Sequence, residues 1–254
     1  MSPEDPTWRT AISRVRPDEI LVRGHDLVEL IGRRSFGDVV YLLLSGHLPE
    51  GNEGRMIDAI LVSAAEHSVV APSVAAARYA ASAGIPLQAA VAVGVTALGD
   101  HHGGAVEGAA RMLIDAGEAE EDADAAARGT VRAYRERGDR LPGYGHVVHT
   151  ADPRARRLLE VAGELGFRGR WCGIAEAIER AAEAELGRPL AMNIDGAMGA
   201  LLMELGLDWR LGKAFYVIGR PPGFVAHVHE EQTRERPYRD VGWEDVAYDG
   251  PDPQ

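Results

Sequence analysis

Hydrophobic residues along most of this chain recur every three or four positions, which is typical of amphipathic helices. Residues 10–24 follow a different pattern. There, apolar and polar residues alternate through Ile12, Val15, Ile20 and Val22, with a Pro-Asp pair in the middle. Period-two alternation across a turn signal predicts a short β-hairpin. We therefore expect a mainly α protein whose N-terminal part carries a small β element.

The first long helix is expected over residues 36–45. Ser35 precedes it, Asp38 follows three residues later, and Gly46 stands at its far end, so the segment has both a capping box and a glycine stop. Apolar spacing predicts further helices at about 54–67, 73–82, 87–99, 153–165, 173–186 and 209–219. The acidic stretch 117–128 has little apolar pattern and is expected to be an exposed helix or loop.

Composition narrows the class of protein. A chain of 254 residues with 46% hydrophobic residues can bury a substantial core. Its net charge of −12 argues against binding to nucleic acid or to an anionic membrane surface. The single cysteine, Cys172, excludes an internal disulfide. The acidic N-terminus is unlike a signal peptide, and no apolar run reaches the roughly 18 residues of a membrane span, so we expect a cytoplasmic protein.

The stretch Leu141 to Arg154, LPGYGHVVHTADPR, has the composition of a ligand-binding loop. Glycine lacks a Cβ, so the backbone around Gly143 and Gly145 can approach a ligand closely. His146 follows as a titratable group, and Arg154 comes just after the proline that opens the next helix. A histidine beside a fixed guanidinium suits an anionic substrate from which a proton must also be moved.

Two further residues are candidates for chemistry. His102, in HHGG, is either a histidine satisfied by the core or a cap, or a neutral imidazole donating to a developing oxyanion, because a helix N-terminus disfavours its protonated form. Asp195, in NIDGAMG, is either an N-cap or a carboxylate that moves a proton to or from carbon.

Four arginines stand beside proline or glycine or in turn contexts rather than on helical stripes. They are Arg154, Arg220, Arg236 and Arg239. Each alone would be interpreted as a surface residue, but four of them in an acidic chain favour a polycarboxylate site. Metal binding is the competing use of the histidines, which are His101, His102, His146, His149, His227 and His229. Because no HxxxH or HExxH spacing occurs, we expect no catalytic metal.

These motifs stand in an order that resembles the citrate synthase superfamily, and most of all its short, stand-alone citryl-CoA lyases, related to the C-terminal module of ATP-citrate lyase. The resemblance covers about residues 10–250. It rests on EHSVVAPS, HHGGA, LPGYGHVVHTADPR, NIDGAMGALL, GRPPGFVAH, RPYR and the entry pattern from residue 20 to 49. It implies a citrate synthase-like, two-lobed helical fold, with lobes formed by residues 1–99 and 197–254 and by residues 100–196.

The resemblance also implies roles for individual residues. His102 matches the histidine that holds the thioester oxygen of acetyl-CoA, His146 the acid/base at the carbon joining the two halves, and Asp195 the base at the methyl group. The matches to oxaloacetate-binding groups are His67, Arg154, Arg220 and Arg236, the last donated across a dimer interface, with Arg239 as a rival. Gly143, Tyr144 and Gly145 match a segment that approaches coenzyme A.

Two departures from the family pattern bear on the function. HGGANE reads HGGAVE here, so Val106 replaces an amide, and NIDG replaces the NVDF type common in synthases. Together with the short chain, NIDG favours a homodimeric lyase that cleaves citryl-CoA to acetyl-CoA and oxaloacetate, without a metal or a cofactor beyond the coenzyme A of its substrate. The alternatives are a citrate or 2-methylcitrate synthase and a non-enzymatic binder of acyl-CoA or dicarboxylate.

Overall fold

A computed structural model describes residues 8–145, 151–187, 189–240 and 242–251 of the chain. The chain divides into two compact units, and each is built from two segments that are distant in sequence. Unit 1 combines Met1–Ala64 with Gly103–Gly219, and unit 2 combines Ala65–His102 with Arg220–Gln254. The lobe boundaries expected from the sequence stay a prediction.

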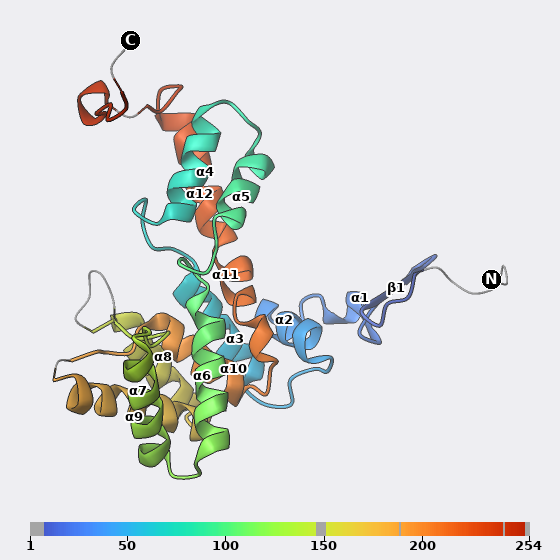
Figure 1. Cartoon of the computed structure of the whole chain (residues 1–254). Coiled ribbons are helices and arrows are strands. Elements are labelled where there is room, and N and C mark those ends of the chain that lie inside the picture. The colour runs from blue at the N-terminus through green and yellow to red at the C-terminus, as the bar shows by residue number, and fades with distance from the viewer. Residues whose placement is uncertain (1–7, 146–150, 188, 241, 252–254) are drawn as a thin grey trace, which may run out of the picture. The chain divides into compact units, whose positions relative to one another are not determined.

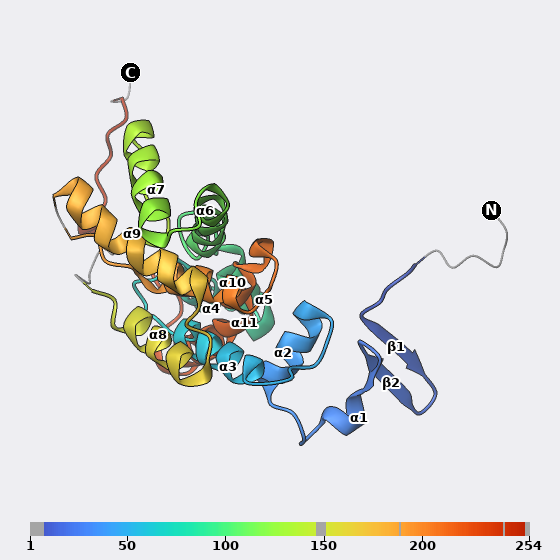
Figure 2. The same cartoon turned by 90° about the horizontal axis from the view of Figure 1, so that it is seen from below.

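The expected N-terminal hairpin is confirmed. Strands β1 (Ser13–Arg16) and β2 (Glu19–Val22) pair antiparallel, with Val15 opposite Ile20 (Figure 2). Asp18 in the connecting turn has a φ of 61°, a left-handed value that aspartate tolerates better than most residues. A third strand, β3 (His25–Asp26), extends the sheet in the order β1-β2-β3. It was missed because two residues are too few to show an alternating pattern.

Helix α2 (Phe36–Ser45) has the ends that its sequence predicts. Ser35 and Asp38 form the reciprocal capping box, and Gly46 ends the helix in the left-handed conformation. The other helices of unit 1 are α1 (Leu27–Leu30), α3 (Glu53–Ala64), α6 (Ala105–Ala119), α7 (Ala123–Arg137), α8 (Pro153–Leu165), α9 (Arg170–Leu186), α10 (Ile194–Glu204), η1 (Trp209–Leu211) and α11 (Ala214–Gly219). Helix α10 packs against α6, α8 and α9 and is the most buried of them (Figure 1).

Unit 2 is a small helical bundle. Helices α4 (Pro72–Ser82) and α5 (Leu87–Thr96) pack against each other and against α12 (Pro221–Arg234), and a short turn, η2 (Trp243–Asp245), follows (Figure 1). The small residues of α5 allow close packing. A Cβ at Gly94 would lie 3.2 Å from both the Ala77 methyl and the Phe224 ring.

Several predicted helix boundaries were wrong. The predicted helices do not include residues 221–234, yet α12 begins at Pro221, because prolines in a first helical turn remove only N–H groups that have no helical partner. The helix expected at 209–219 is divided into η1 and α11. The acidic stretch 117–128 holds the end of α6 and the start of α7, with Asp122 as an N-cap. Within the described residues, no helix is both long and apolar enough to span a bilayer.

Candidate functional site

The glycine loop packs directly on the start of α10. The main chain of Gly143 accepts a hydrogen bond from Asn193 N at 3.0 Å, and Gly145 N donates to Ala191 O at 2.7 Å. The side-chain amide of Asn193 adds a bond to Gly145 O at 2.7 Å. Both glycines have positive φ values, 83° and 79°. The backbone at these glycines therefore does approach another group closely. In the structure that group is the start of α10 and the residues just before it, which belong to the same chain.

Gly196 lies in close contact with the glycine loop, where a residue with a side chain would collide. A Cβ on Gly196 would lie 2.4 Å from Gly143 O and 2.7 Å from the Met192 side chain. Such distances are impossible without displacement of the loop, since neither the carbonyl nor the packed methionine has room to move. The glycine after Asp195 thus lets the LPGYG loop rest on the first turn of α10.

We expect Gly196→Ala to destabilise the protein by about 2 kcal/mol, the usual cost of overpacking a tight contact. Gly173→Ala is the matched control, because Gly173 lies in α9 with nothing within 4 Å of its Cβ position. That control should be neutral or stabilising by up to about 1 kcal/mol. Denaturant unfolding measures both, and equal stabilities for the two variants would contradict the prediction.

Asp195 lies in the first turn of α10 and is half-buried. The N-cap alternative for this residue is wrong, because Asn193 is the cap and its Oδ1 accepts from the backbone N–H groups of Asp195 and Gly196. The Asp195 carboxylate instead accepts a hydrogen bond from the hydroxyl of Tyr216, at 2.6 Å. It is thus a side chain held by a tertiary contact rather than one used to start a helix.

Asp152 connects the predicted substrate arginine to the same helix. Its carboxylate is fully buried and forms an ion pair of 2.9 Å with Arg154. It also accepts hydrogen bonds from Arg154 N at 3.0 Å and from Ile194 N, in α10, at 3.1 Å. Burial alone would raise the pKa of Asp152, but the hydrogen bonds and charge of Arg154 outweigh it and lower the pKa. One ionised carboxylate therefore links the beginnings of α8 and α10.

We expect Asp152→Asn to lower the free energy of unfolding by about 2 kcal/mol at neutral pH, because the amide loses the charge that Arg154 requires. The folded-state pKa of Asp152 lies below its unfolded value. Its contribution is therefore complete above the unfolded pKa and is lost as the pH falls through the folded one. Unfolding measured from pH 7 to pH 3 should show a smaller acid-induced loss in the variant.

The control for that prediction is Asp124→Asn. Asp124 forms an ion pair with Arg180 in which both side chains are more than half exposed, so its loss should cost under about 1 kcal/mol. A loss for Asp152→Asn as small as that of the control would show that the buried carboxylate does not hold the two helix starts together.

His102 is the last residue of its segment in unit 2 and is half-buried. Its Nε2 lies 2.7 Å from the hydroxyl of Ser73, at the start of α4. If that hydroxyl donates, the imidazole proton belongs on Nδ1, which is then a hydrogen-bond donor. Burial lowers the pKa of His102, and the positive charge of Arg220 lowers it further. The neutral form expected from the sequence is confirmed in direction, but its main cause is burial and not a helix N-terminus.

The remaining predicted substrate residues of unit 2 have different surroundings. Arg220 is 2% exposed and stands at the start of α12. His67 is half-buried in the segment after α3, and Arg236 is exposed. Arg239 donates two hydrogen bonds, of 2.8 and 2.9 Å, to Glu231, whose side chain is 1% exposed. This pairing favours Arg236 over Arg239 as the group available to a substrate carboxylate.

His146 and His149 lie outside the described residues, so their predicted roles stay predictions. Among the residues that the structure does describe, no three histidine, cysteine, aspartate or glutamate side chains are grouped as metal ligands. The buried thiol of Cys172 has its pKa raised to about 12, mainly by burial, and it is therefore not a nucleophile at neutral pH.

Sequence reasoning missed four residues that form hydrogen bonds with predicted site residues. They are Ser73, Asp152, Asn193 and Tyr216. Asp152 and Asn193 carried a signal, since each precedes a helix and caps it, as aspartate and asparagine often do. Ser73 and Tyr216 carried none, because their partners are 29 and 21 residues away in the chain.

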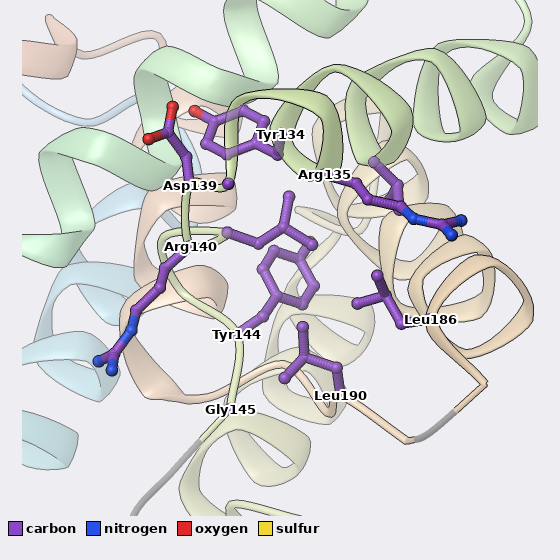
Figure 3. A pocket seen from close by; sticks show the side chains of 11 residues that line it. Tyr134, Arg135, Asp139, Arg140, Tyr144, Gly145, Leu186 and Leu190 are labelled. Carbon is purple, nitrogen blue, oxygen red and sulfur yellow. The ribbon is translucent and has the colours of Figure 1, made fainter.

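A cavity of about 510 Å³ lies beside the glycine loop within unit 1. Its wall combines the end of α7, the 138–145 connection and the end of α9. Figure 3 shows Leu186 and Leu190 facing the ring of Tyr144, with the guanidinium groups of Arg135 and Arg140 outside this apolar group. Tyr144 itself is fixed, since its buried hydroxyl donates to Ala175 O at 2.7 Å.

Comparison with known proteins identifies the family. Residues 50–240 match the family model described as citrate synthase, C-terminal domain. The putative citrate synthase 2 of Mycobacterium tuberculosis H37Rv is 35% identical over 213 residues, which are 81% of this chain and 54% of that protein. The chain belongs to the citrate synthase family. Citrate synthase 2 of Bacillus subtilis is 29% identical over 83% of the chain and 55% of its own length. The chain thus spans about half the length of these curated relatives.

Solved structures of similar proteins include one of nearly the same length and one much longer chain. Citryl-CoA lyase from Hydrogenobacter thermophilus is 41% identical with a TM-score of 0.92, and the match covers 98% of this chain and 97% of that one. ATP citrate lyase from Methanothrix soehngenii, solved with citrate and coenzyme A, is 26% identical with a TM-score of 0.84, over 99% of this chain and 43% of that one. These matches confirm the predicted citrate synthase-like helical fold.

Proposed function

We propose that this protein is a citryl-CoA lyase, which cleaves citryl-CoA to acetyl-CoA and oxaloacetate. The observation that carries the proposal is the similarity, over almost the full length of both chains, to the citryl-CoA lyase of Hydrogenobacter thermophilus. The curated citrate synthases match only with about half of their length.

The proposed reaction is a retro-aldol cleavage. His146 takes the proton of the tertiary hydroxyl while the carbon–carbon bond breaks, and the electron pair of that bond forms an enolate on the thioester. His102 donates a hydrogen bond to the enolate oxygen, a role that its neutral imidazole and its Ser73 contact support. Asp195, in its protonated form, then transfers a proton to the carbon.

Substrate binding is proposed for two sets of residues, one for the oxaloacetate half and one for coenzyme A. Arg154, Arg220 and Arg236 would bind the carboxylates of the oxaloacetate half, with His67 as a further contact. Gly143, Tyr144 and Gly145 would contact coenzyme A, and the adjoining cavity would take its adenosine part. Apolar side chains next to two guanidinium groups suit a heterocycle that carries phosphates.

The proposed lyase is a cytoplasmic homodimer that uses no metal and no cofactor beyond the coenzyme A of its substrate. Large apolar side chains that are more than half exposed support the dimer, because an interface between copies of the chain would remove them from water. In unit 1 these include Val15, Val28, Ile31 and Phe36. The mass in solution, measured by light scattering, tests this proposal, and a monomeric mass at micromolar concentration would reject it.

The deciding experiment supplies synthetic (3S)-citryl-CoA to the purified protein and measures oxaloacetate and acetyl-CoA. The proposal requires that both products form in equal amounts. Folded protein that yields neither would reject it.

The second candidate is a citrate or 2-methylcitrate synthase, and the identities of 35% and 29% to citrate synthases favour it. A synthase condenses an acyl-CoA with a keto acid and then hydrolyses the thioester. Release of free coenzyme A from acetyl-CoA or propionyl-CoA with oxaloacetate, without cleavage of citryl-CoA, would support the synthase instead.

A further inference from the structure

Tyr216 is a buried tyrosine whose hydroxyl donates a hydrogen bond to the carboxylate of Asp195, the proposed acid. The residue lies in α11, is 5% exposed, and donates from its hydroxyl to Asp195 Oδ1 at 2.6 Å. A hydrogen bond of this length to a carboxylate is among the stronger ones in proteins. Because both residues belong to unit 1, the contact is internal to one compact body.

The position of Tyr216 is set by glycine contacts near both ends of α11. A Cβ at Gly212, before the helix, would lie 2.9 Å from Glu107 N and 3.0 Å from the Val106 side chain, both in α6. A Cβ at Gly219, its last residue, would lie 2.9 Å from Leu61 O in α3. These backbone approaches fix the short helix against two others, so the phenol is held where it is. Val106, the departure from the family's HGGANE motif, takes part in this packing.

The hydrogen bond has a direct chemical effect on Asp195. A donor stabilises the ionised carboxylate more than the protonated acid, so the phenol makes Asp195 a stronger acid and a weaker base. The hydrogen bond also restrains rotation of the carboxyl group. The oxygen that bears the proton therefore keeps one orientation.

We infer that Tyr216 is a positioning residue that acts through Asp195, because its hydroxyl holds the carboxyl group in one orientation for proton transfer at the acetyl carbon and stabilises its ionised form. The inference rests on the proposed function, in which cleavage ends with this proton transfer. Asp195 loses its proton to the enolate carbon and becomes a carboxylate. The hydroxyl proton that His146 accepted balances this loss, and both groups return to their starting forms through water.

Other charged groups also surround α10 and remain unchanged when Tyr216 is replaced. They are Asp152 and Arg154 from α8, Glu179 from α9, and Glu107 with Lys213 from α6 and the connection before α11. They contribute equally to the pKa of Asp195 in the wild type and in a Tyr216 variant. A difference in the pKa of Asp195 between the two proteins therefore reports the effect of the phenol hydroxyl.

The test is Tyr216→Phe, which removes one oxygen and keeps the ring. We expect kcat for citryl-CoA cleavage at neutral pH to fall about 10-fold, with KM unchanged, because the carboxyl group of Asp195 loses the hydrogen bond that orients it for proton transfer. The exchange of acetyl-CoA methyl protons with deuterated water, measured with oxaloacetate present, needs ionised Asp195. Its half-maximal pH should move upward by about one unit.

Two controls separate this role from a structural one. Tyr41→Phe removes another buried tyrosine hydroxyl of unit 1, from α2, and should leave rate and pH profile unchanged. Tyr216→Phe in an Asp195→Asn background should cause no further loss of rate, because the hydroxyl has no carboxylate left to tune. A further loss of about 10-fold in that background would overturn the inference.

The outcomes also separate this inference from the proposed function. Methyl exchange reports proton transfer at Asp195 in either reaction direction. Absence of citryl-CoA cleavage with normal exchange would count against the lyase alone. An exchange profile of Tyr216→Phe that overlays the wild type, or a wild type without any exchange, would overturn the role of Tyr216.

Discussion

Replacement of Asp195 by asparagine is expected to lower kcat for citryl-CoA cleavage by a factor on the order of 10²–10⁴, the usual range for a lost general acid or base. Asparagine can still accept the hydrogen bond from Tyr216, so the packing around α10 should persist. The amide cannot transfer the proton that the enolate carbon needs. The loss should therefore fall on kcat, with little change in KM, when oxaloacetate formation is followed.

Asp115→Asn is the matched control for that variant. Asp115 lies on the exposed side of α6, where it pairs with Arg111, and should tolerate the same change without loss of activity. If Asp195→Asn retained a rate within a factor of about 10 of the wild type, Asp195 would not be the acid in this reaction.

Replacement of His102 by alanine is the second large effect expected. Removal of one oxyanion donor costs a factor on the order of 10²–10³ in kcat. Because burial and the charge of Arg220 lower the pKa of His102, its imidazole is already neutral at pH 7. Raising the pH above 7 should therefore not change its protonation. The variant should lose both cleavage of citryl-CoA and exchange of the methyl protons of acetyl-CoA.

The neighbouring His101→Ala serves as the control, since His101 is exposed. Circular dichroism and thermal unfolding of both variants would check that the fold is intact. Wild-type methyl exchange in folded His102→Ala would contradict the assignment of this residue to the enolate oxygen.

Both of these residues were predicted as site residues from the sequence, and the structure gives partly different causes for their local environments. His102 was expected to be neutral because of a helix terminus, whereas burial is the main cause. Asp195 had a competing explanation as an N-cap, which Asn193 in fact provides two residues earlier. Their residue types and their positions in the motifs allowed the prediction of these residues. The causes of their local environments could not be predicted in the same way.

The supporting residues show where sequence reasoning ends. Asp152 reaches the backbone of α10 across 42 positions, Tyr216 reaches Asp195 across 21, and Ser73 reaches His102 across 29. No periodicity or capping rule extends over such separations. These contacts became visible only with the packing of α8, α11 and α4 against their neighbours.

The sequence by itself determined the features that depend on neighbouring residues. These are the hairpin at Ser13–Val22, the capped helix α2, the helical start at Pro153 and the mainly helical class. Each follows from interactions within about four residues of the chain or across one tight turn. The order of its motifs also indicated the family to which the chain belongs.

Tertiary structure alone decided how the glycine loop rests on α10 and which residue holds Asp195. The physical reason is that burial, close backbone contact and hydrogen bonding between distant segments arise only when those segments pack. A linear pattern specifies which side chains are available for such contacts, and the packed chain selects their partners.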